Sequence, residues 1–177
     1  MTDADPILVP MSEHPAFLLG QLGFHVTNRY TELLAPLGIS PRHSGMLRML
    51  SANDGQSQQQ LCEVLRIHRN VMVGLVDELE KRGLVERRKH PTDRRAHAVY
   101  LQPAGRKVIA QAERIVAALD AEILGALDPA QRATLTELLQ QTSVANGLQP
   151  GVHPGLRPAH GDQLAHPGPA VENAPRL

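Results

Sequence analysis

Apolar and polar residues alternate with the period of an α-helix in the first part of the chain. Between residues 14 and 37 the apolar side chains recur every three or four positions, at Leu18, Leu22, Val26, Tyr30, Leu33 and Leu37. Pro15 suits the first turn of a helix, where no backbone donor is needed, and Gly38 suits the residue just past its end. The pattern predicts one long amphipathic helix over about residues 14–37.

Three shorter helices are predicted next, each bounded by turn or capping residues. Ser40-Pro41 begins the first of them, because the hydroxyl can accept a free backbone N–H and proline needs no donor there. Residues 53–55 (NDG) form a turn that ends it. A short helix is expected over residues 58–65, and another over about residues 68–82, where Gly83 supplies the left-handed residue that ends it.

The period then changes from helical to extended. Residues 84–89 and 96–101 are short strand candidates, and the polar loop 90–95 between them contains a proline that cannot continue a strand. These features predict a β-hairpin with a charged tip. Helical spacing then returns and predicts two more helices, one of about 24 residues from Pro103 and one from Pro129 to about residue 146.

Two short helices joined by a tight turn and followed by a hairpin are typical of a winged helix-turn-helix. The charge distribution supports this interpretation. The chain has 18 Lys and Arg and 18 Asp and Glu in total, yet residues 66–107 contain eleven basic and five acidic residues, a net charge of +6. A polyanion would therefore meet a basic face on a neutral molecule.

Composition excludes several other classes of protein. A single Cys cannot form an internal disulfide, and no apolar run approaches the ~18 residues that a membrane span needs. Residues 1–10 lack the basic and apolar segments of a secretory leader. We therefore expect a cytoplasmic protein with no membrane partner.

The two ends of the chain differ from the part between them. Residues 1–13 are expected to form a flexible arm. Residues 148–177 hold six Pro and four Gly without an apolar period, so a disordered tail is expected. The tail histidines His153, His160 and His166 lie too far apart to form a compact metal-ligand pair, and no metal site is predicted.

Four stretches of the chain together carry a family resemblance. They are residues 34–41 (LAPLGISP), 75–87 (LVDELEKRGLVER), 93–96 (DRRA) and 101–105 (LQPAG). In this order and spacing they resemble the multiple-antibiotic-resistance regulator (MarR) family of winged-helix transcription factors, over about residues 14–146.

The resemblance implies a mainly α fold with a small β-hairpin wing, in which a winged helix-turn-helix lobe is joined to a helical dimerisation region. Residues 14–147 would form this MarR-like domain, with the lobe at about 40–101 and the dimerisation helices at about 14–37 and 103–147. Two copies would bind a pseudo-palindromic DNA operator as a homodimeric repressor. A small aromatic or anionic ligand would release the repressor, and no cofactor is implied.

The resemblance also implies which residues contact DNA. Arg95 matches the wing arginine that enters the minor groove, and Asp93 matches the carboxylate that orients it. Arg94 and Arg88 add positive charge beside it. The candidates in the first turns of the reading helix and at the start of the preceding helix are His68, Arg69, Asn70, Val71, Val73 and Gln58; Arg can pair with guanine and Asn with adenine. Val71 and Val73 depart from the family, which often has hydroxyl residues at these positions. These valines could contact thymine methyl groups or simply pack. A solvated ion pair would also explain Asp93 and Arg95.

The resemblance also implies a small-molecule effector pocket in the cleft between the dimerisation helices and the DNA-binding lobe. His25, Arg29 and Tyr30 on the first helix, with His43 and Met46 on the second, are the candidates, because Arg and His could hold a carboxylate beside an apolar wall. Interhelical hydrogen bonds are the alternative for His25 and Arg29. Cys62 is expected to pack in the core as an inert thiol.

Three other functions are compared with that of a ligand-responsive repressor. A metal-dependent regulator would use some of the nine histidines, although only His90 and His97 lie close together. A winged helix could instead serve as a protein-docking module. An enzyme is not expected, because the chain has no CxxC, HExxH, GxSxG or phosphate-binding glycine motif.

Overall fold

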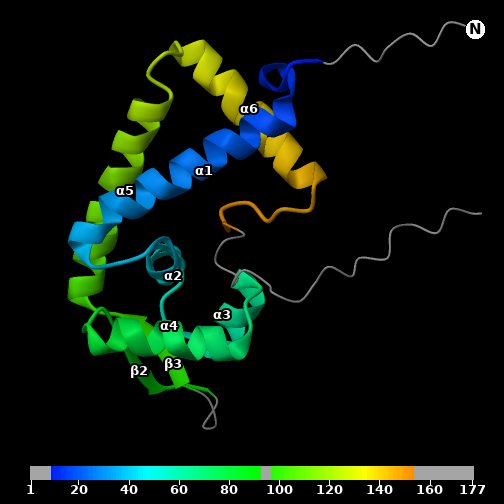
Figure 1. Cartoon of the computed structure of the whole chain (residues 1–177). Coiled ribbons are helices and arrows are strands. Elements are labelled where there is room, and N and C mark those ends of the chain that lie inside the picture. Colours follow the sequence, from blue (N-terminus) through cyan, green and yellow to red (C-terminus); the bar gives the residue numbers. More distant parts are fainter. Residues whose placement is uncertain (1–8, 93–96, 154–177) are drawn as a thin grey trace, which may run out of the picture.

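The computed structural model describes residues 9–92 and 97–153. All six predicted helices and the predicted hairpin are present, within about two residues of their expected bounds in most cases. A short 3₁₀ helix at Met11–Glu13 precedes them. The elements are α1 Pro15–Leu34, α2 Pro41–Ala52, β1 Gln56–Ser57, α3 Gln58–Leu65, α4 Arg69–Lys81, β2 Val85–Lys89, β3 His97–Leu101, α5 Pro103–Ile123 and α6 Pro129–Ala145. The mainly α fold with a small hairpin is therefore confirmed (Figure 1).

Local capping explains why the helices begin where they do. Three of them start with a reciprocal cap, in which the side chain before the helix accepts the backbone N–H of the third helical residue, whose own side chain binds back. The pairs are Ser40 with His43, Ser57 with Gln60, and Asp128 with Gln131. Proline occupies the first position of α1, α2, α5 and α6.

The sheet has three antiparallel strands in the order β1-β3-β2. Val85 pairs with Leu101 at the base of the hairpin, and Lys89 pairs with His97 towards its tip. The sequence pattern does not predict β1, because two residues have no measurable period. It joins the sheet where Gly55, at φ +77°, donates its N–H to the Val99 carbonyl at 3.0 Å.

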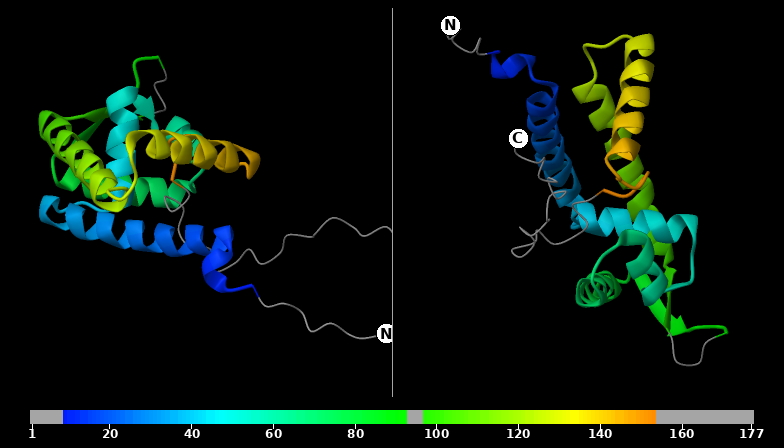
Figure 2. Two further views of the ribbon diagram at one scale, coloured as in Figure 1. Left: turned by 90° about the horizontal axis from the view of Figure 1, so that it is seen from above. Right: turned by 90° about the vertical axis from the view of Figure 1, so that its right-hand side faces the viewer.

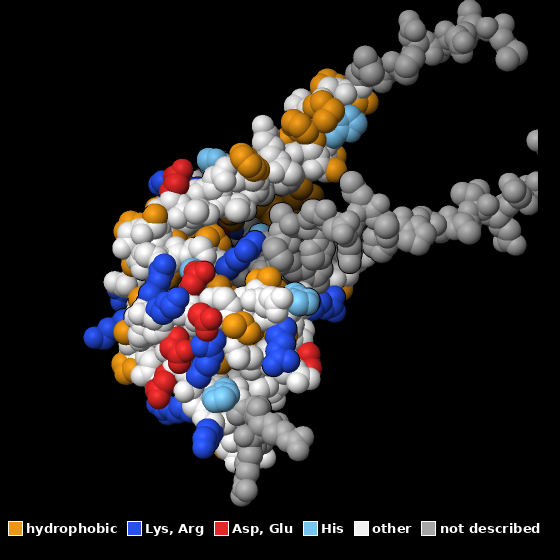
Figure 3. All heavy atoms as spheres, turned by 60° about the horizontal axis from the view of Figure 1, so that its bottom comes forward, with side chains coloured by type: hydrophobic (Ala, Val, Ile, Leu, Met, Phe, Trp, Pro, Cys, Tyr) orange, Lys and Arg blue, Asp and Glu red, His pale blue; other side chains and the backbone are white. Residues whose placement is uncertain are grey.

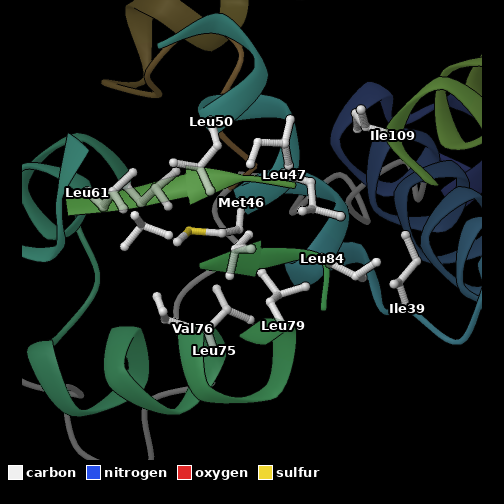
Figure 4. Packing of buried hydrophobic residues seen from close by; sticks show 14 of the residues in the cluster. Ile39, Met46, Leu47, Leu50, Leu61, Leu75, Val76, Leu79, Leu84 and Ile109 are labelled. Carbon is white, nitrogen blue, oxygen red and sulfur yellow. The ribbon is translucent and has the colours of Figure 1, made fainter. Parts of the chain in front are cut away.

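The hydrophobic core lies inside the winged helix-turn-helix lobe (Figure 4). Side chains from α2, α3, α4 and the hairpin converge there, and Ile109 of α5 joins them at one side. Met46, Leu47, Leu50, Leu61, Val76, Leu79 and Val99 are completely buried. The burial of these side chains holds α4 against the sheet, so one face of α4 points into the core and the other faces solvent.

Outside the lobe, α1 and α6 form two separate arms (Figure 2). α1 packs on α5, and the guanidinium of Arg29 binds Glu122 of α5 at 2.9 Å. α6 contains no buried residue. Both arms leave large apolar side chains in solvent: Phe17, Leu18, Leu19, Leu22 and Phe24 on α1, and Leu138, Leu139 and Val144 on α6. In the described part of the chain, no helix is both long enough and apolar enough to cross a membrane.

Candidate functional site

The first turn of α4 presents polar side chains to solvent. His68 caps the helix, with Nδ1 accepting the backbone N–H of Asn70 at 3.2 Å. Ile67, just before it, is buried in the core. Arg69 and Asn70 are exposed, so both side chains extend from a fixed helix end.

The two valines predicted to contact DNA lie on different faces of α4. Val73 is exposed, whereas Val71 is half-buried and packs against the hydrophobic core. Val73 can therefore offer an apolar contact to a partner. The packing of Val71 against the core helps to hold α4 in place.

Adjacent arginines of β2 lie in different environments. Arg87 is only 20% exposed, and its guanidinium binds both Asp77 and Glu80 of α4. Arg88 is 55% exposed; it binds Glu86 at 2.9 Å and lies over the ring of Tyr100. The hydrogen bond from Arg88 holds the pKa of the Glu86 carboxyl below its usual value. Arg87 therefore ties the hairpin to α4, while Arg88 remains accessible.

Gln58 and the residues at the tip of the wing are the remaining candidates for DNA contact. Gln58 is half-buried at the start of α3, and its Nε2 is buried without a hydrogen-bond partner in the part of the chain described. Asp93, Arg94 and Arg95 lie outside the described residues, so their roles remain predictions.

Figure 3 shows Lys and Arg side chains intermixed with carboxylates over the lobe.

A cavity of about 610 Å³ lies between α1, α2, α5 and the segment that follows α6. Apolar and small side chains make up much of its wall, and its lining also includes Arg42, Arg48, Asp120 and His153. The other lining residues are Val26, Thr27, Tyr30, Ser40, Pro41, Ser44, Gly45, Met49, Leu65, Val116, Leu119 and Gly151. The cavity therefore combines an apolar wall with charged groups of both signs.

Of the five residues predicted for an effector pocket, Tyr30 lines this cavity. His25 is exposed on α1, and Arg29 binds Glu122 and Glu32 instead. Met46 is completely buried in the core, and His43 is buried against α4. These four residues do not line this cavity, and their role in an effector pocket stays a prediction. Sequence reasoning missed Arg42 and Arg48, which lie on the other face of α2.

His43 has a well-defined set of partners. The Ser40 N–H donates to its Nδ1 at 3.1 Å, so the neutral ring carries its proton on Nε2 and donates it to Glu78 of α4 at 2.9 Å. Burial lowers the pKa of His43, and the hydrogen bond to Glu78 opposes this effect only in part. The ring is therefore a neutral link between α2 and α4.

Cys62 is half-buried and packs against the core. Burial raises the pKa of its thiol, which disfavours the reactive thiolate. Among the described residues, no group of three or more His, Cys, Asp and Glu side chains is placed to hold a metal ion.

Comparison with known proteins places this geometry in a family. Residues 37–96 match the MarR family. A protein of Thauera aromatica assigned to regulation of the hcr operon is 31% identical over 132 residues, which cover 70% of this chain and 80% of that protein. The chain belongs to the MarR family of transcriptional regulators. The family match covers α2, β1, α3, α4 and β2 of the winged helix-turn-helix lobe and ends just before β3.

Solved structures of MarR proteins have the same fold. The repressor CouR of Rhodococcus jostii RHA1, bound to a 23-mer DNA duplex, is 29% identical with a TM-score of 0.68, over 77% of this chain and 99% of that one. The Mycobacterium tuberculosis MarR protein Rv2887, in complex with salicylic acid, is 26% identical with a TM-score of 0.59, over 77% and 98% of the two chains.

Proposed function

We propose that this MarR protein is a sequence-specific DNA-binding repressor that acts as a homodimer and leaves its operator when a small ligand binds. The exposed first turn of α4, which presents Arg69 and Asn70, carries the proposal. These side chains can donate to guanine and adenine edges in a major groove that admits one helix. CouR, a relative with a similar fold, has been solved on DNA.

The wing would contact the DNA beside the reading helix. Arg88 lies on the strand that leads to the tip and is accessible. Arg95, oriented by Asp93, is the proposed minor-groove arginine, and Arg94 the proposed phosphate contact. Gln58 would serve at the start of α3 only if its side chain turns outward.

A second copy would cover the apolar arms. Exposed contiguous apolar surface of this kind marks an interaction site, and the side chains of α1 and α6 supply it. A two-fold axis between two lobes would place the reading helices about one DNA turn, ~34 Å, apart.

The cavity is the proposed effector site. Its volume of about 610 Å³ lies within the range of small-molecule pockets. Apolar walls beside arginine and histidine suit a flat ligand with an acidic group. Rv2887 in complex with salicylic acid supports a ligand of this kind.

Selection of bound sequences from a random pool of DNA duplexes tests the proposal. We expect a pseudo-palindrome whose half-sites are about one turn apart. Arg69→Ala should then weaken binding to the selected duplex by about 10- to 100-fold and relax base preference at one position of each half-site. Recovery of no sequence, with equally weak binding to every duplex at low salt, would favour a protein-docking module instead.

A further inference from the structure

The first turn of α2 has two faces with different surroundings. Ser40 and Ser44 line the cavity, whereas His43 between them is buried and faces α4. This turn therefore separates the cavity from the helix that carries Arg69 and Asn70.

Polar contacts make the turn a stiff unit. Ser40 and His43 cap each other's backbone N–H, and Pro41 fixes the first helical residue. On the cavity side, the hydroxyl groups of Tyr30 and Ser44 lie 2.7 Å apart in a hydrogen bond. A displacement of Ser40 or Ser44 will therefore carry His43 with it.

His43 connects the first turn of α2 to α4. Its Nε2–H donates to Glu78, at 2.9 Å. Glu78 lies nine residues after Arg69, which corresponds to about 13 Å along the helix. On the same helix, Asp77 and Glu80 bind Arg87 of the hairpin. α4 is thus held from α2 on one side and from the wing on the other.

We propose that His43 is a positioning residue that couples the cavity to the reading helix through Glu78. The inference rests on the proposed role of the cavity as the effector site. A ligand that moves Ser40 or Ser44 changes the His43–Glu78 contact, and the orientation of α4 changes with it. A ligand can shift the balance only by its different affinity for the two arrangements.

The chain itself offers the matched variant. His43→Gln removes the ring that reaches Glu78 but keeps a side chain that can complete the cap of α2. Gln60 and Gln131 do this at the equivalent positions of α3 and α6. Glu78→Ala removes the contact from the other side, and Glu78→Gln keeps an oxygen that can accept the His43 proton.

Hydrogen exchange under native conditions measures the coupling without DNA or ligand. Tyr30→Phe removes the hydroxyl that binds Ser44 and so perturbs the cavity wall. In the otherwise unchanged chain we expect it to raise the exchange of amides in residues 72–81 of α4 up to about tenfold, as loss of one hydrogen bond allows. The same change in the His43→Gln or Glu78→Ala background should add nothing, and the Glu78→Gln background should restore the effect.

The inference would be overturned if Tyr30→Phe raised the exchange of the α4 amides by the same factor in the His43→Gln background as in the original chain. It would also be overturned if the α4 amides of Tyr30→Phe exchanged at the original rate. Glu137→Ala, on the exposed α6, is the control background and should leave the response intact. A purely structural role for His43 would raise exchange throughout the lobe without removing the effect of Tyr30→Phe. If the coupling is present but no duplex is bound, DNA binding as the proposed function fails, while the coupling between the cavity wall and α4 stands.

Discussion

Gly105, in the first turn of α5, has no space for a side chain. A Cβ atom there would lie 2.2 Å from the Leu84 carbonyl oxygen, which also accepts the Gln102 N–H at 3.0 Å. We predict that Gly105→Ala lowers the free energy of unfolding by about 1–3 kcal/mol, as overpacking does. Chemical denaturation measures this change. Gly74→Ala is the matched control, because a Cβ there meets nothing within 4 Å, and its stability should stay equal or rise.

His43 predicts a pH dependence of stability. Its folded pKa is lowered, chiefly by burial and further by the charge of Arg82, while Glu78 acts in the opposite direction. The unfolded chain therefore takes up a proton near pH 6.5 that the folded chain resists. Stability should fall as the pH drops below about 6.5, with a slope of at most ~1.4 kcal/mol per pH unit from this group.

Denaturation at several pH values between 5 and 8 tests this sign. The His43→Gln variant should lose part of the slope below pH 6.5, although its stability at neutral pH is also lower. The same change at His25, which is exposed on α1, should leave the slope close to that of the original protein. Parallel curves for His43→Gln and the original chain would contradict the prediction.

At the scale of elements, the neighbouring arginines of β2 allow a separation of fold from binding. We predict that Arg88→Ala leaves the unfolding free energy within about 0.5 kcal/mol of its original value, since exposed ion pairs contribute little. Arg88→Ala should also weaken DNA binding and reduce the slope of log affinity against log salt by about one. Arg87→Ala should mainly destabilise the lobe, because it leaves Asp77 and Glu80 without their cation.

Chemical denaturation of Arg87→Ala and Arg88→Ala compares their free energies of unfolding, and DNA binding at several salt concentrations compares their salt slopes. Arg88→Ala with an unchanged salt slope would show that this side chain does not meet phosphate. Equal stability of the two variants would show that Arg87 is not the tie between hairpin and α4.

Elements that have local signals could be predicted from the sequence, and contacts between elements could not. Ser40-Pro41 and Gly83 mark helix ends by their own backbone chemistry, so α2 and α4 were located within one or two residues. The cavity depends on how α1, α2 and α5 sit against one another. Arg42 and His43 are adjacent in sequence, yet one lines the cavity and the other faces α4, and periodicity alone does not say which neighbour each face meets.

At the scale of the whole molecule, two helices of the chain carry apolar surface that lies exposed to solvent. Two arms, α1 and α6, diverge from the lobe, and apolar residues such as Phe24, which is 72% exposed, lie on them (Figure 2). Burying that surface against a second copy would offset the cost of exposing it to water. One lobe presents one reading helix, so the proposed pair of half-sites would need two copies.

We predict that Leu138→Glu, on the exposed face of α6, converts a dimer into a monomer. A charge placed in an apolar interface loses its hydration without gaining a partner, and this costs several kcal/mol. Sedimentation equilibrium of the original protein and of Leu138→Glu measures the mass of each in solution. Binding of Leu138→Glu to the selected duplex should weaken by at least about 100-fold, because each half-site is then held by a separate molecule. Ser51→Glu, at the exposed end of α2, adds the same charge away from the arms and should remain dimeric. A Leu138→Glu variant with the same mass in solution and the same affinity as the original would mean that the α6 arm is not where two copies meet.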